Sequence, residues 1–169
     1  MAFDETARRP SAPAVSFISW RDIFVLIDTG RATAADYKPA CAAIVAQSGR
    51  FPSGIGCLTI IPEDAVRPSD EGRRTINDAI ASVEQNLRCM CWLVEGTGFQ
   101  AATARAILTG IRLFGRQKYA TNVVTSLQQG LAWVLPHLEG ETTRLPQVPI
   151  AVLAINNERR ELGEPTRSR

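Results

Sequence analysis

Hydrophobic and polar positions follow two different periods along this chain. Short apolar runs of strand length alternate with longer segments in which apolar residues recur every three or four positions, the spacing of a helix that buries one face. The strands predicted from these runs are Val15–Trp20, Asp22–Asp28, Ile55–Ile61, Cys89–Val94 and Asn122–Thr125. Because strands alternate with helices, we expect right-handed crossovers onto a mostly parallel sheet, with the first two strands forming an antiparallel hairpin at its edge.

Residues that favour helix N-termini place four helices among these strands. The first helix begins after Thr33, and the second is capped by Ser69 and runs to about Leu87. The third runs from Phe99 to about Phe114, and the fourth follows Ser126. The apolar stripes expected to face the core are Ile76, Ile80, Val83 and Leu87 on the second helix, and Ala104, Ile107, Leu108 and Ile111 on the third.

The resulting order, β-β-α-β-α-β-α-β-α, predicts one α/β domain with a five-stranded mixed sheet over residues 14–163. For the last element, Pro149–Leu162 fits a helix that ends at Gly163, and Val148–Leu153 fits a strand. The polar residues 1–13 predict a disordered leader, and residues 164–169 predict a flexible tail.

Composition and charge narrow the function classes. The 169 residues are 45% apolar and 21% charged, and 19 Lys+Arg against 17 Asp+Glu give a net charge of only +2. This balance argues against nucleic acid as a partner, since nucleic-acid binding requires a concentrated basic face. No apolar run approaches the length of a membrane span, and the polar N-terminus lacks a secretory signal. We therefore expect a soluble, cytoplasmic protein whose four cysteines are reduced.

Two segments resemble a known family. Val25–Gly30 leads into the Thr33-capped helix, and Asn122–Ser126 leads into Leu131-Ala132-Trp133. With the order of elements, these segments resemble STAS-like domains of the SpoIIAA-like, anti-sigma-factor-antagonist type. The resemblance implies a five-stranded α/β fold and a role in bacterial signalling through protein–protein contacts. It also implies that a phosphorylatable serine follows the third strand, a place that Ser69 holds here.

The residues around Ser69 allow two interpretations. As an N-cap, Ser69 stabilises the second helix by roughly 1 kcal/mol. As a phosphosite, it places negative charge at a helix start. Arg67, Arg73 and Arg74 can accept that charge, and the adjacent Asp70 and Glu71 oppose it.

A glycine-containing loop follows the fourth strand. Glu95-Gly96-Thr97-Gly98 stands between a strand and a helix, where backbone N–H groups can bind an anion. The loop lacks the lysine of a P-loop and the third glycine of a dinucleotide fingerprint. The alternative interpretation is a tight turn capped by Thr97.

Arginines recur on one side of the third predicted helix. Arg105, Arg112 and Arg116 are seven and four residues apart and share a face. Most such stripes are simply solvated, but arginines can also bind an acidic partner surface. Aromatic residues at both ends of the helix, Phe99 and Phe114, would add to an interface if the helix were exposed.

The cysteines and the histidine do not match the patterns of a metal site or of an activated nucleophile. Cys89 and Cys91 share one face of a strand near Cys57, but their spacing is not that of a zinc site. His137, the single histidine, has no nucleophile motif beside it. We expect no catalytic residues, no metal and no cofactor.

Three functions follow, in order of preference. The first is a non-catalytic protein-interaction module, in signalling or as a subunit of a larger assembly, that presents Ser69, Arg73, Arg105, Arg112 and Arg116. Such a chain can also form a homo-oligomer through its first strand, an unpaired sheet edge. The second is a small-molecule or anionic-ligand domain using Glu95, Gly96, Thr97 and Gly98. The third is a hydrolase-like enzyme with Glu95 or Asp28 as general base.

Overall fold

The computed structural model describes residues 13–114, 117–138 and 148–163. The predicted leader, apart from its last residue, and the predicted tail lie outside these ranges. The strands are β1 (Val15–Trp20), β2 (Ile23–Asp28), β3 (Ile55–Ile61), β4 (Leu87–Val94) and β5 (Ala120–Val124). The helices are α1 (Ala34–Arg50), α2 (Asp70–Val83), α3 (Phe99–Phe114), α4 (Leu127–Val134) and α6 (Val148–Glu161), with a 3-10 turn, η1 (Leu135–His137), after α4.

The five strands form one sheet in their order along the chain, β1-β2-β3-β4-β5. β1 runs antiparallel to β2, with Val15 opposite Asp28 and Trp20 opposite Ile23, and every other pair is parallel. Arg21, with φ of 53°, lies in the tight turn between the two antiparallel strands. The predicted class, a five-stranded mixed α/β sheet with an edge hairpin, is therefore confirmed.

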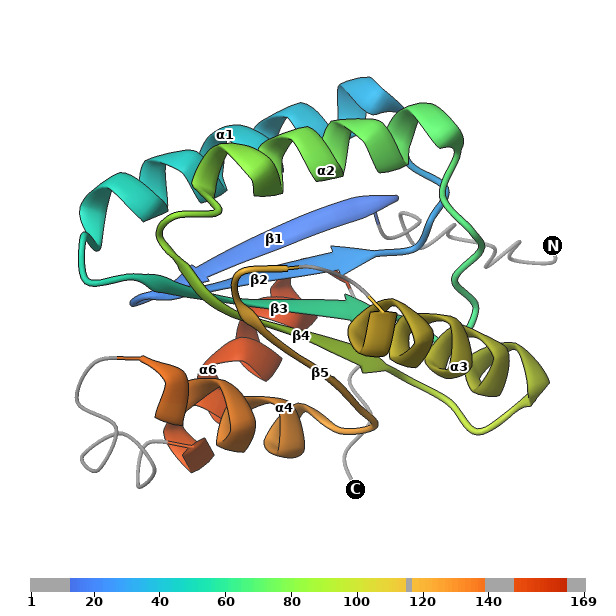
Figure 1. Ribbon diagram of the computed structural model, residues 1–169. Coiled ribbons are helices and arrows are strands. Elements are labelled where there is room, and N and C mark those ends of the chain that lie inside the picture. The colour runs from blue at the N-terminus through green and yellow to red at the C-terminus, as the bar shows by residue number, and fades with distance from the viewer. Residues whose placement is uncertain (1–12, 115–116, 139–147, 164–169) are drawn as a thin grey trace, which may run out of the picture.

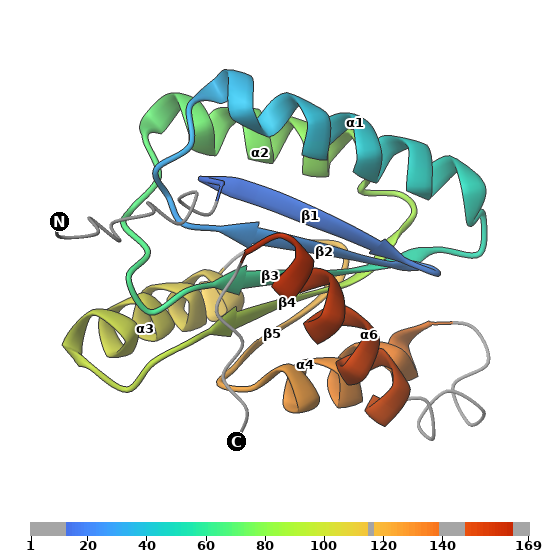
Figure 2. The ribbon, with the colours of Figure 1, turned by 180° about the vertical axis from the view of Figure 1, so that it is seen from behind.

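Helices cover both faces of the sheet. α1 and α2 lie side by side on one face (Figure 1), and α4 and α6 cover the other (Figure 2). α3 follows on the α1–α2 face, where it packs against β4 and β5. This arrangement follows from right-handed crossovers, because strands added in one direction place each connecting helix on the same face.

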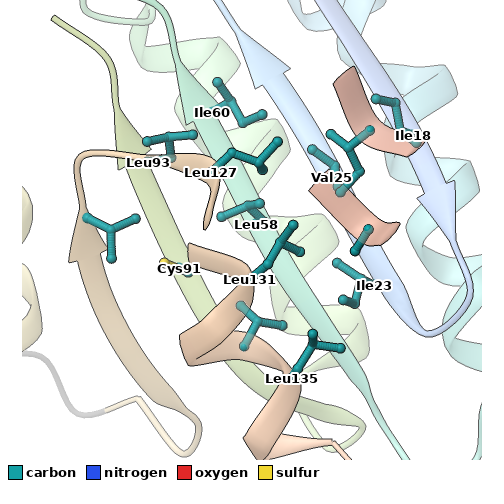
Figure 3. Close-up of a cluster of buried hydrophobic side chains, with 14 of the residues drawn as sticks. Ile18, Ile23, Val25, Leu58, Ile60, Cys91, Leu93, Leu127, Leu131 and Leu135 are labelled. Carbon is teal, nitrogen blue, oxygen red and sulfur yellow. The ribbon is translucent and has the colours of Figure 1, made fainter. Parts of the chain in front are cut away.

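The larger hydrophobic cluster fills the space between the sheet and α4 with α6. In Figure 3, Leu127, Leu131 and Leu135 approach side chains of β2, β3 and β4, including Val25 and Leu58. α6 contributes Val148, Ala151 and Ile155, one face of a helix at three- and four-residue spacing. The last element is therefore the predicted helix, and the alternative of a strand at 148–153 is wrong.

The second cluster lies under α1 and α2. Phe24 and Cys57 of the sheet pack there with Ala40 and Ile44 of α1. Every residue of β2 is buried, because this strand has a neighbour on each side and helices on both faces. α2 ends at Val83 rather than near Leu87, since Leu87 begins β4.

Gly30 permits a close approach between two loops. It has φ of 74°, and a Cβ atom at this position would lie 1.7 Å from the carbonyl oxygen of Val66. The two loops are also joined by the backbone N–H of Val66, which donates to the carbonyl of Thr29 at 2.9 Å.

We expect Gly30→Ala to lower the free energy of unfolding by about 3 kcal/mol or more, because it adds a backbone clash to the strain of positive φ. The matched control is Gly163→Ala, with φ of 77° and no atom within 4 Å of its Cβ position. The control should lose only about 1 kcal/mol. Urea denaturation measures both, and equal losses would show that the loop contact is unimportant.

Candidate functional site

A long groove of about 1320 Å³ runs between α2 and α3. Its floor comes from the sheet, where Cys57 and Thr59 of β3 lie beside Met90 and Trp92 of β4. Ile76 and Ile80 of α2 form part of one wall. α3 forms the opposite wall, with Ile107 and Ile111. Most of the lining side chains are apolar.

The groove exists because its two walls pack on different neighbours. α2 packs chiefly on α1, whereas α3 packs on β5 and the adjacent strand β4. Ala101, in the first turn of α3, is buried. Between the helices, Ile76, Ile80 and Trp92 are only partly covered.

The predicted inward stripe of α3 is therefore wrong in part. Ile107 and Ile111 were expected to face the core, yet they are 59% and 44% exposed. Phe99, at the start of the same helix, is 86% exposed. Helical spacing identified the apolar face of α3, but no element of the described chain covers that face.

Charge gathers at one end of the groove. Arg67, Arg73 and Arg74 line it near the N-terminus of α2. The N-terminus of α3 lies at the same end, because both helices follow the carboxyl ends of neighbouring parallel strands. The partial positive charges of two helix N-termini thus add to three guanidinium groups.

Ser69 caps α2, as predicted. Its hydroxyl accepts a hydrogen bond from the backbone N–H of Gly72 at 3.0 Å. Arg73, predicted as a partner-binding residue, forms an ion pair with Asp70. Arg74 donates from Nε to the backbone carbonyl of Asp70 at 3.3 Å.

The other predicted arginines differ in their surroundings. Arg105 folds back on the sheet edge, where its guanidinium donates to the carbonyls of Val94 and Gly96 at 3.3 and 3.0 Å. Arg112 is exposed. Arg116 lies outside the described residues. The structure therefore brings Arg73 and Arg74 together at the groove and uses Arg105 to hold the loop after β4.

The residues of loop 95–98, predicted as an alternative ligand site, lie in different surroundings. Glu95 forms a two-bond ion pair with Arg159 of α6, with N–O distances of 2.9 and 3.2 Å. Thr97 and Gly98 are exposed. Gly96 has φ of 87°, as a turn requires. Glu95 thus anchors α6 to the end of β4, which also argues against its use as a general base.

Arg159 was not singled out from the sequence. It is 2% exposed and lies on the buried face of α6 with Ala151 and Ile155. One feature of the sequence could have identified it. Arg159 follows Ile155 and Ala151 at four-residue spacing, so an arginine occupies a position where a helix of this pattern buries an apolar residue. A buried arginine requires a carboxylate partner, and Glu95 meets that requirement.

Asp28 lies at the end of β2, where it lines the groove. Its Oδ1 accepts hydrogen bonds from the Gly30 N–H at 2.8 Å and from the Tyr37 hydroxyl at 2.9 Å. Burial raises the pKa of the Asp28 carboxyl, although both hydrogen bonds act in the opposite direction. Burial, followed by the charge of Asp28, raises the pKa of Tyr37 above its usual range.

The cysteines and His137 do not converge. Cys89 and Cys91 belong to the cluster under α4, whereas Cys57 belongs to the cluster under α1. Burial raises the pKa of the Cys57 and Cys91 thiols to about 12, which keeps them protonated. His137 is exposed in η1, where its Nδ1 lies 2.8 Å from the carbonyl of Trp133.

Comparisons of the chain with protein-family models, with curated proteins and with solved structures found no match. Among the helices of the described residues, none has both the length and the apolar character to cross a membrane.

Asp28→Asn should change how stability depends on pH. Burial raises the folded-state pKa of Asp28 above the ordinary pKa of an aspartate, so its contribution is fully present below that ordinary value and is lost as pH rises through the raised pKa. Relative to the variant, the wild type should therefore lose stability upward from about pH 4. Urea denaturation across this range measures the difference, and parallel profiles would contradict it.

Arg159→Met should destabilise the fold by about 3–5 kcal/mol, because it leaves Glu95 without its cation in a mostly buried place. The double variant Glu95→Leu/Arg159→Met should recover much of that loss. Arg31→Met is the control, since it breaks an exposed pair with Asp64 and should cost at most about 1 kcal/mol. Denaturant melts of all three test this, and a similar loss for Arg31→Met and Arg159→Met would refute it.

Proposed function

We propose that this chain is a protein-binding module whose α2–α3 groove receives a helix of a partner protein. The observation that carries the proposal is the uncovered apolar face of α3. Ile107 and Ile111 stand exposed beside a partly covered floor that includes Trp92. Monomeric proteins rarely leave such contiguous apolar surface open unless it binds something.

The dimensions favour a helix over a small ligand. Small-molecule pockets usually measure about 300–1000 Å³, and this groove is larger. A helix about 10 Å wide fills a comparable volume over about 11 residues, or three turns. Phe99, which lines the groove and is 86% exposed, extends the apolar surface to the N-terminal end of α3. A helix lying in an apolar groove is a common mode of protein recognition.

The groove chemistry supports binding rather than catalysis. Among the described lining residues, Asp28 is hydrogen-bonded to Tyr37, and the Cys57 thiol is buried with a raised pKa. Neither group has the activated character of a nucleophile or base. The loop 95–98, the alternative ligand site, has less support because Glu95 is held by Arg159. A STAS-like role in bacterial signalling, a cytoplasmic location and pairing through β1 remain predictions.

Selection of helical peptides from a display library tests the proposal. We expect enriched peptides that bind the native chain and lose at least about tenfold in affinity with Ile107→Asp, because a charge would enter an apolar contact. The matched control is Leu153→Asp on α6, a residue that is 60% exposed on the opposite side of the sheet. It should leave binding unchanged.

Circular dichroism and thermal melting confirm that both variants fold. A selection that enriches no helical peptide, or peptides that respond equally to both variants, would overturn the proposal.

A further inference from the structure

We infer that the partner helix is amphipathic and acidic, and that its acidic end lies against Arg67 and Arg74. This inference rests on the proposed function, and it names the chemistry of the occupant. Two observations support it: arginines in the groove lining lack carboxylate partners among the described residues, and these arginines lie at one end of the groove.

The charged residues of the lining do not balance. Three arginines, Arg67, Arg73 and Arg74, face two carboxylates, Asp28 and Asp70. Asp70 is paired with Arg73, and Asp28 accepts hydrogen bonds from the protein itself. Among the described residues, Arg67 has no hydrogen-bond or ion-pair partner, and Arg74 bonds only a backbone carbonyl. Within the part of the chain that the structure describes, two guanidinium groups therefore have no carboxylate partner, and both can bind an anionic one.

The α3 wall adds no negative charge. Its sequence from Phe99 to Phe114 contains no aspartate or glutamate. A second copy that inserted its own α3 into the groove would bring no carboxylate to the arginines. Charge complementarity therefore favours an acidic partner over self-association.

Charge gathers at one end of the groove, whereas apolar side chains line its whole length. The arginines lie near the N-terminus of α2, together with the exposed Val66 and Phe99. Ile80 of α2 and Ile111 of α3 lie toward the C-terminal ends of the same helices. The two helices run parallel, so these isoleucines share the far end. A matching helix has an apolar stripe along its length and carboxylates near one end.

Charge-swapped derivatives of the enriched helical peptide test the inference. Both derivatives keep the apolar face, and one end carries three glutamates in the first and three lysines in the second. Fluorescence anisotropy should show the acidic peptide binding at least about tenfold more tightly, and this preference should shrink as salt is raised. Arg67→Glu/Arg74→Glu should reverse the preference.

The control variant, Lys38→Glu/Arg50→Glu, changes the net charge equally but alters α1 outside the groove. It should keep the preference for the acidic peptide. Equal binding of both derivatives, with sensitivity to Ile107→Asp retained, would overturn the acidic-helix inference and leave the proposed function standing.

Two further outcomes would also overturn the inference. Sedimentation of the chain alone would do so if it showed a dimer that Ile107→Asp dissolves, because a second copy would then occupy the groove. Dodecanoate would do so if it displaced the acidic peptide and bound more tightly, because the groove would then belong to a small amphipathic anion.

Discussion

The handedness of the β-α-β crossovers is the constraint on which the rest of this structure depends. β2 to β5 are laid down in order along one direction of the sheet, so α1, α2 and α3 must all lie on the same face. The opposite face then has no crossover helix, and α4 and α6 cover it after the last strand. The larger core cluster lies under these two late helices, where Ile155 of α6 and Leu131 of α4 are fully buried.

The same constraint makes the groove. α2 completes its packing against α1, and α3 is held near β5 at the far side of the sheet. The floor between them includes Trp92, which is only partly covered and too apolar to be left to water without a cost. A surface of this kind, bordered at one end by arginines, combines the hydrophobic contact that gives affinity with charges that select the partner.

Buried polar residues near the carboxyl ends of the strands serve the fold. Glu95 and Arg159 join β4 to α6, and Asp28 joins the end of β2 to Tyr37 of α1 and to the turn at Gly30. Glu95 and Asp28 lie at the carboxyl ends of their strands, where α/β proteins commonly bind ligands. Here both carboxylates are already paired within the protein.

The sequence by itself determined the element order, the edge hairpin, the Ser69 cap and the apolar face of each helix, because these depend on neighbours within a few residues. It left the last element open between helix and strand. It could not show that Ile107 and Ile111 stay exposed, since exposure depends on where α2 packs rather than on the spacing within α3. The sequence also could not reveal the ion pair between Glu95 and Arg159, because these residues are 64 positions apart in the chain. Only the tertiary structure decided these features, because burial and ion pairing arise between segments that the chain connects at long range.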